Sequence, residues 1–216
     1  MTGLPSFRAP RVRSSLAGAR YDAPGARELP RLIVVADVAS APRPLPEIVA
    51  GAAEHGARAF VLRARELPPR EQAELFAALR AVLPDGCVLI LAGGPSPAVH
   101  LSATEAFPQP RPALVGRSCH HAVDIDRALE EQCDYVFVSP VYETPSKPGY
   151  GPPLGPAGLA SLCPPGLRVY ALGGVLPDRV AECLGAGAFG VAIMGPVLHD
   201  PPIVAAYLAA LPEVAE

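Results

Sequence analysis

Glycines in the last quarter of the chain could bind a phosphate group. Gly173 and Gly174 follow a short apolar run. A glycine pair lets the backbone approach a ligand closely and direct N–H groups at it. Met194 and Gly195 stand at the end of a second apolar run. A glycine pair alone is more often an ordinary turn, but in an α/β barrel the loops after strands seven and eight form the usual phosphate site. We therefore predict that these four residues contact a small phosphorylated ligand.

A proline-stiffened loop, 139–151, carries a second group of polar side chains. It holds Lys147, the only lysine of the chain, together with Thr144 and Ser146. Prolines restrict the conformations of the loop, so these side chains could bind an anion at a reduced entropic cost. The alternative is an ordinary solvated loop. The position of the single lysine favours a binding function.

The segment 116–121 could supply a proton-transfer group. His120 follows a predicted strand, and a histidine at the carboxyl end of a strand can transfer protons near neutral pH. A lone histidine is usually structural, but here His121 adjoins it. Cys119 could act as a nucleophile beside His120, although neighbours on a strand point to opposite sides. The residues alone leave a structural and a proton-transferring role for these histidines equally open.

Two arginines follow the second apolar run. Arg63 and Arg65 are two residues apart, so in an extended conformation they share a face. Two guanidinium groups on one face could clamp a pyrophosphate or a carboxylate. The alternative is a solvated pair of surface arginines.

The elements that must position these residues are visible as an alternation of short apolar runs and amphipathic segments. The runs are continuous and rich in Val, Ile and Leu, which is typical of strands buried on both faces. They are 32–36, 59–62, 87–92, 98–101, 113–115, 135–138, 168–172 and 190–194. The segments with helical spacing are 45–55, 70–82, 123–132, 177–184 and 202–211. This order predicts parallel strands with right-handed crossovers, and eight strands favour a closed (β/α)₈ TIM barrel.

The barrel is expected to be degenerate at one point. Only six residues, 93–98, separate Ala92 from Val99, and a crossover helix needs more. Either the third helix is missing or 98–101 is not a strand. Residues 1–30 show no sustained period and are predicted to form a poorly ordered extension, with the barrel domain at 31–212.

Composition excludes several classes of partner. The net charge of −3 leaves no basic surplus for nucleic acid or an anionic membrane. No apolar run approaches the roughly 18 residues that a membrane span needs. The five cysteines are odd in number and form no C-x-x-C pair, which argues against a disulfide framework or a zinc site. We expect a cytoplasmic protein with reduced thiols, and a homo-oligomer is compatible with the sequence.

Taken in order, these segments resemble the thiamine phosphate synthase / thiazole tautomerase (TenI) superfamily over about 31–211. Segment 116–120 matches the family's G-x-S-x-H, and 139–148 is similar to its G-P-V-F-x-T-P-T-K-P loop. Segments 172–175 and 191–197 are similar to its I-G-G-I and V-A-V-x-S-A-I motifs, and 60–65 resembles its pattern of two basic residues after strand two. The resemblance implies a small phosphorylated thiazole or pyrimidine ligand.

The resemblance also implies roles for particular residues. A pyrophosphate would face Arg63, Arg65, Thr144 and Lys147. The phosphate of a thiazole would be held by Gly174 and Gly195 through backbone N–H groups. The remaining implied ligand contacts are Ser118, Ser146, Gly173 and Met194.

The chain departs from the synthase pattern where that pattern binds Mg²⁺. The family synthase has Asn-Asp after strand three and an acidic residue after strand four, whereas this chain has no carboxylate between Asp85 and Glu105. A pyrimidine-contacting Gln of the family is also replaced, by Val61. The tautomerase branch needs no metal, and its acid/base histidine corresponds to His120. We therefore predict metal-independent tautomerisation of a thiazole phosphate, with no cofactor. The alternatives are a Mg²⁺-dependent synthase joining hydroxymethylpyrimidine pyrophosphate to thiazole phosphate, and a non-catalytic binding or regulatory protein.

Overall fold

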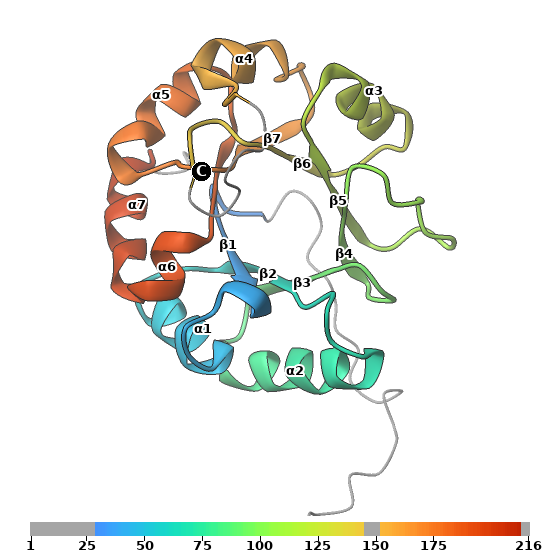
Figure 1. Ribbon diagram of the computed structural model, residues 1–216, viewed down its shortest axis with the longest axis vertical. Helices are drawn as coiled ribbons and strands as arrows, with labels where there is room; N and C mark the ends of the chain where they lie inside the picture. The colour runs from blue at the N-terminus through green and yellow to red at the C-terminus, as the bar shows by residue number, and fades with distance from the viewer. Residues whose placement is uncertain (1–28, 145–151, 213–216) are drawn as a thin grey trace, which may run out of the picture.

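The structure is a computed structural model that describes residues 29–144 and 152–212. Its centre is a closed barrel of eight parallel strands, in which each strand pairs with the next and β8 returns to β1 (Figure 1). The strands are β1 (Leu32–Asp37), β2 (Ala59–Arg63), β3 (Val88–Ala92), β4 (Ala98–Leu101), β5 (Leu114–Cys119), β6 (Tyr135–Val138), β7 (Arg168–Ala171) and β8 (Gly190–Ile193). The predicted fold class is confirmed, and every predicted strand is present.

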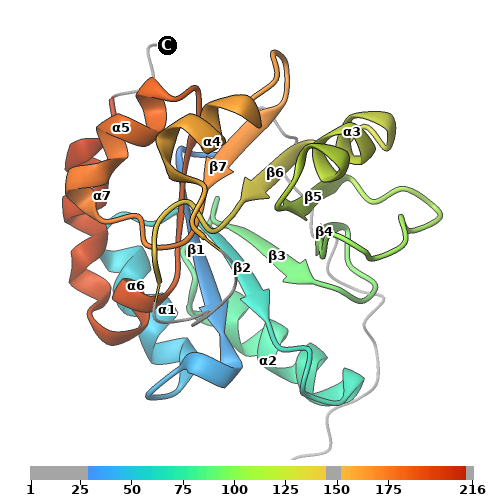
Figure 2. The same cartoon turned by 45° about the horizontal axis from the view of Figure 1, so that its top comes forward.

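Helices cover most of the outside of the barrel (Figure 1, Figure 2). They are α1 (Leu45–Glu54), α2 (Pro69–Val82), α3 (Ala122–Glu130), α4 (Gly155–Ser161), α5 (Val180–Gly185), α6 (Gly195–His199) and α7 (Val204–Ala210), with 3₁₀ turns at η2 (Val38–Ser40), η3 (Pro177–Arg179) and η4 (Pro201–Ile203). The five predicted helices are found, the last two each beginning as a 3₁₀ turn. The sequence analysis missed α4 and α6 because both are short and begin with Gly-Pro, which reads as a loop.

Alternation along the strands separates two cores. Tyr135 and Phe137 of β6 point into the barrel, where their rings pack on each other with centroids 5.4 Å apart. Val136 and Val138 of the same strand point outward to the layer under the helices. Gly116 of β5 is the register partner of Tyr135, and a Cβ there would lie 2.1 Å from Tyr135 Cζ. The glycine of the G-x-S-x-H segment therefore makes room for the tyrosine ring.

The expected degeneracy is confirmed between β3 and β4, which are joined by residues 93–97 without a helix. β4 is nevertheless a true strand that pairs with β3 and β5. The next connection, 102–113, also contains no helix, so the irregular flank is wider than predicted. Figures 1 and 2 show this flank beside β4 and β5, between α2 and α3.

A buried arginine holds the helix-free flank in place. Arg117 of β5 has no exposed surface and points outward. Its Nη1 donates to the carbonyl oxygens of Ser102, Ala103 and Glu105 at 2.8, 3.1 and 2.9 Å. Its Nη2 pairs with the Glu131 carboxylate, which also accepts from Arg127 Nε at 2.9 Å. These bonds satisfy backbone oxygens that a helix would otherwise satisfy itself.

The chain enters the barrel at its amino end. Leu29 is 3% exposed within the inner core, and the Pro30 carbonyl accepts a hydrogen bond from Tyr170 Oη at 2.8 Å. These two residues belong to the barrel, although they were predicted to end the extension. The rest of the predicted extension, 1–28, lies outside the described residues. Within the described part, no helix has both the length and the apolar character to cross a membrane.

Candidate active site

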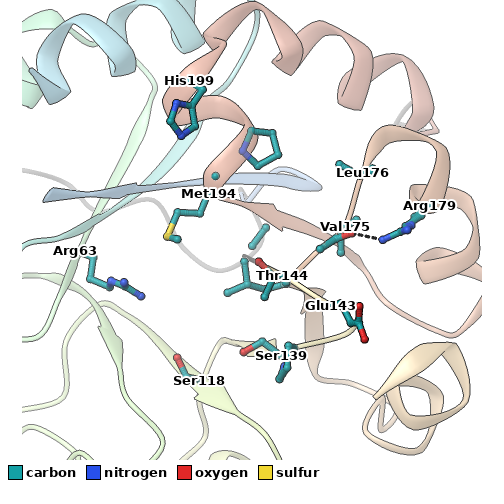
Figure 3. Close-up of a pocket in the computed structure, with 17 residues that line it drawn as sticks. Arg63, Ser118, Ser139, Glu143, Thr144, Val175, Leu176, Arg179, Met194 and His199 are labelled. Carbon is teal, nitrogen blue, oxygen red and sulfur yellow. Dashed lines mark hydrogen bonds between the residues drawn. The ribbon is translucent and has the colours of Figure 1, made fainter. Parts of the chain in front are cut away.

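A cavity of about 600 Å³ opens at the carboxyl ends of the strands (Figure 3). Residues from five strand ends and the loops after them form its wall. They are Arg63, Ser118, Ser139, Pro140, Glu143, Thr144, Leu172, Gly173, Gly174, Val175, Leu176, Arg179, Ala192, Met194, Gly195, Pro196 and His199. The structure thus brings Arg63, Ser118, Thr144, Gly173, Gly174, Met194 and Gly195 of the predicted ligand contacts into one cavity. Ser146 and Lys147 lie outside the described residues.

The double glycine is required by a close crossing of two chain segments. Gly173 and Gly174 have φ angles of 94° and 65°, which favour glycine. A Cβ on Gly174 would lie 2.3 Å from the carbonyl oxygen of Glu143, and one on Gly173 would lie 2.9 Å from Pro140 Cα. The loop after β6 therefore rests directly on the turn after β7, and the backbone of that turn is exposed to the cavity.

Arg63 stands on the opposite side of the cavity, held by a buried carboxylate. Its Nε donates to Asp37 Oδ1 at 2.5 Å, and Asp37 is 1% exposed. Ser40 Oγ donates to the other carboxylate oxygen at 2.5 Å. Because Asp37 is buried and also bonded to Ser40, its carboxylate fixes the direction of the Arg63 guanidinium. The sequence analysis missed Asp37, whose only signal is a charge at the end of an otherwise apolar strand.

Arg65 takes a different position from Arg63. Its Nη2 pairs with Glu105 Oε2 at 2.7 Å, and both side chains are partly exposed. Arg65 is not among the residues that line the cavity. β2 ends at Arg63, so the extended backbone that would have kept the two arginines on one face stops before Arg65. In this structure the predicted two-arginine clamp is not formed.

Ser118 is held by a histidine inside the barrel. His100 Nε2 lies 2.9 Å from Ser118 Oγ, and His100 Nδ1 lies 3.1 Å from Tyr135 Oη. Burial, with Arg65 and Arg117 nearby, lowers the pKa of His100 to about 3, so the ring is neutral. The neutral His100 ring therefore fixes the Ser118 hydroxyl at the cavity wall. The sequence analysis did not select His100, because a single histidine in an apolar run carries no distinctive spacing.

His120 lies beside the cavity rather than among its lining residues. Its Nδ1 is 2.6 Å from the carbonyl oxygen of Ser139, and Ser139 lines the cavity. A carbonyl can only accept, so Nδ1 carries the proton and Nε2 is the basic nitrogen of the neutral ring. Cys119 is buried in the outer core, where burial raises its pKa to about 12. A thiol with that pKa is a poor nucleophile.

Comparison with known proteins places the chain in a family. The sequence profile described as Thiamine monophosphate synthase matches residues 32–197. The protein belongs to the thiamine monophosphate synthase family. It is 35% identical over 177 residues to a putative thiamine-phosphate synthase of Geobacter sulfurreducens, covering 74% of this chain and 82% of that one. It is 31% identical over 179 residues to the thiamine-phosphate synthase of Moorella thermoacetica, covering 76% and 85%.

The fold agrees with this membership. Thiamine phosphate pyrophosphorylase from Pyrococcus furiosus superposes with a TM-score of 0.69 at 22% identity, covering 86% of this chain and 96% of that one. Membership confirms the resemblance found in the sequence and places the protein in thiamine biosynthesis. The names of the relatives favour the synthase, which the sequence analysis gave as an alternative, over the tautomerase that it preferred.

The Mg²⁺ that the resemblance attaches to a family synthase does not fit the described residues. Among 29–144 and 152–212, no group of three or more His, Cys, Asp or Glu side chains is placed to hold a metal ion. One carboxylate does reach the expected place, since Glu105 Oε1 is 3.6 Å from where a Cβ of Gly93 would be. That carboxylate already accepts from Arg65 Nη2 and, at 3.1 Å, from the Ser102 N–H. The Glu105 carboxylate beside Gly93 is thus paired with the guanidinium of Arg65.

Proposed function

We propose that this protein joins a hydroxymethylpyrimidine pyrophosphate to a thiazole phosphate. A C–N bond forms between the thiazole nitrogen and the methylene carbon of the pyrimidine. The C–O bond to pyrophosphate breaks, and its electron pair leaves with the pyrophosphate. The products are thiamine phosphate and pyrophosphate.

One observation carries the proposal: the cavity has a group suited to binding an anion on each of two opposite sides. Figure 3 shows Arg63 on one side of the cavity and, on the other, Val175, which directly follows the Gly173–Gly174 turn. A volume of about 600 Å³ falls within the usual range for small-molecule sites. The charged groups of two phosphorylated ligands could therefore bind at separate positions in the cavity. The relatives named thiamine-phosphate synthase are consistent with this reaction.

The side chains divide the work by their chemistry. Arg63, fixed by Asp37, is placed to stabilise the negative charge that grows on the departing pyrophosphate. Thr144, at the end of the loop that rests on the glycine turn, adds a hydroxyl to the cavity lining. Ser118 offers a hydroxyl whose direction is set by His100. The glycine turn presents its backbone to the phosphate of the thiazole.

The test is product formation from both substrates. Purified protein with both substrates should release pyrophosphate and yield thiamine phosphate, identified by mass spectrometry, over a range of Mg²⁺ concentrations and in EDTA. Arg63→Gln should lower turnover about 100-fold, as loss of a transition-state charge partner does. Absence of product from the wild type under every condition would rule out the synthase.

Tautomerisation of a thiazole carboxylate phosphate is the second candidate, favoured by the Nδ1 contact with the Ser139 carbonyl, which leaves Nε2 as the proton-accepting nitrogen of the neutral His120 ring. It predicts isomerisation of that single substrate in EDTA, lost in His120→Ala. Equal rates in wild type and His120→Ala would end it. Saturable binding of thiazole phosphate with neither reaction would instead indicate the non-catalytic binding protein.

A further inference from the structure

A second arginine lines the cavity on the side of the double glycine. Arg179 follows that turn at the end of η3, and neither the sequence analysis nor the family motifs quoted above select it. Its Nη1 donates to the carbonyl oxygen of Gly174 at 2.7 Å. Figure 3 shows the side chain reaching toward the turn, across the cavity from Arg63. A cation and the exposed backbone of a glycine turn are thus adjacent.

The guanidinium of Arg179 is held from one further direction, by an aromatic ring that is itself fixed. Its Cζ lies 4.5 Å from the centroid of the Tyr142 ring, within the range of a cation–π contact. The Tyr142 hydroxyl donates to Glu182 Oε2 at 2.5 Å, which fixes the ring. Glu182 stands three residues after Arg179, so the two residues that contact Tyr142 come from the same short stretch of chain.

The position of the guanidinium suits a phosphate more than a neutral ring. A guanidinium has five N–H donors in a planar fork, and the bond to Gly174 uses one of them. The fork matches the oxygens of a phosphate, and stacking on an aromatic ring leaves its edge directed at a ligand. A side chain that is already ordered also loses little entropy when it binds.

We propose that Arg179 recognises the phosphate of the thiazole ligand and makes the protein select phosphorylated thiazoles over the free alcohols. This inference rests on the proposed function for the identity of the ligand. Arg179 acts as a specificity-determining residue, and Tyr142 is the positioning residue that orients it. Arg63 then serves the other ligand, so each arginine of the cavity is matched to one phosphorylated group.

Binding by calorimetry, without turnover, tests the inference directly. The two probes are hydroxyethylthiazole phosphate and the unphosphorylated hydroxyethylthiazole. Arg179→Gln should weaken binding of the phosphate at least about tenfold and leave binding of the alcohol unchanged. Arg70→Gln, which removes an exposed arginine of α2, is the matched control and should alter neither affinity. An equal loss for both probes, or no loss for either, would overturn the inference.

Tyr142 gives a second measurement. Tyr142→Leu removes the ring under the guanidinium and should reduce the preference for the phosphate, whereas Tyr142→Phe keeps the ring and should restore it. If circular dichroism shows that Arg179→Gln does not fold, Arg179→Lys replaces it and should show the same selective loss to a smaller extent. The same preference in Tyr142→Leu as in the wild type would remove Tyr142 from the proposal.

The outcome separates this inference from the proposed function. Wild type that binds the thiazole phosphate selectively but forms no thiamine phosphate would refute the synthase and leave the role of Arg179 standing. Product formation with an unchanged KM for thiazole phosphate in Arg179→Gln would refute the role of Arg179 and leave the synthase standing. Failure of the wild type to bind the thiazole phosphate would refute the role of Arg179.

Discussion

Asp37 and Arg63 are register partners at the ends of β1 and β2, and their side chains form an ion pair of 2.5 Å at the rim of the cavity. The carboxylate is almost fully buried, while the arginine side chain is 42% exposed. Asp37 is therefore the fixed member of the pair, and Arg63 is the member that can contact a ligand. In chemical terms, Asp37 orients Arg63 without facing the substrate itself.

Asp37→Asn tests this orientation. The amide keeps the size of the side chain but loses the charge, so Arg63 should sample more positions. We expect the KM for the pyrimidine pyrophosphate to rise about tenfold, with a much smaller change in the KM for thiazole phosphate. Ser40→Ala, which removes only the other partner of Asp37, is the comparison and should have the smaller effect. Equal changes in both KM values would contradict the assignment.

Comparing Gly174→Ala with a control glycine should distinguish the cost of backbone strain from the loss of ligand binding. The new methyl group would meet the carbonyl oxygen of Glu143 at 2.3 Å, so the loop after β6 must shift. Gly166→Ala is the matched control, since Gly166 also has a positive φ, of 85°, but a Cβ there meets nothing within 4 Å. Gly166→Ala should lose about 1–2 kcal/mol of stability because of its positive φ alone, and Gly174→Ala should lose more because the contact with Glu143 adds to that cost. Only Gly174→Ala should weaken thiazole phosphate binding, by about tenfold or more. Full affinity in this variant would contradict the role of the Gly173–Gly174 turn in binding the ligand.

His100 predicts how stability depends on pH. Its pKa is lowered from 6.5 to about 3, so between these values the unfolded chain binds a proton that the folded protein does not. The folded state therefore gains stability as pH rises through this window and gains no more above it, with a slope of up to about 1.4 kcal/mol per pH unit. Urea unfolding of His100→Gln between pH 4 and 7 should show a flatter dependence than the wild type. His55→Gln, at an exposed histidine, should follow the wild-type profile.

Arg117 predicts where the helix-free flank is weakest. Arg117→Leu would leave the Glu131 carboxylate without this partner and three carbonyl oxygens without this donor. We expect a loss of about 3–5 kcal/mol in urea unfolding. Arg127→Gln removes an arginine of the same network whose side chain is 36% exposed, and it should cost about 1 kcal/mol. Similar losses for the two variants would show that burial of Arg117 is not what anchors the flank.

The strands and the double glycine could be predicted because their signals are local. Runs of Val, Ile and Leu mark buried strands, and the barrel order follows from their number and alternation. The partners that complete the site could not be predicted in the same way. Asp37 meets Arg63 across 26 residues of sequence, and His100 meets Tyr135 across 35. Only the pairing of strands in the folded sheet brings them together. The position of Arg65 outside the cavity lining could not be predicted for a related reason, because it depends on Glu105, 40 residues away.

The crossing of the loop after β6 over the turn after β7 has a thermodynamic consequence. Val141 N donates to Leu172 O at 3.0 Å and Tyr142 N donates to Gly173 O at 2.9 Å, so the two segments form one hydrogen-bonded wall. A ligand that orders the glycine turn also orders the backbone leading to Thr144. The second ligand then meets a wall whose conformational entropy has already been lost, and it binds more tightly than it would alone. We therefore expect the two substrates of the proposed synthase reaction to bind cooperatively, with the same coupling in both directions.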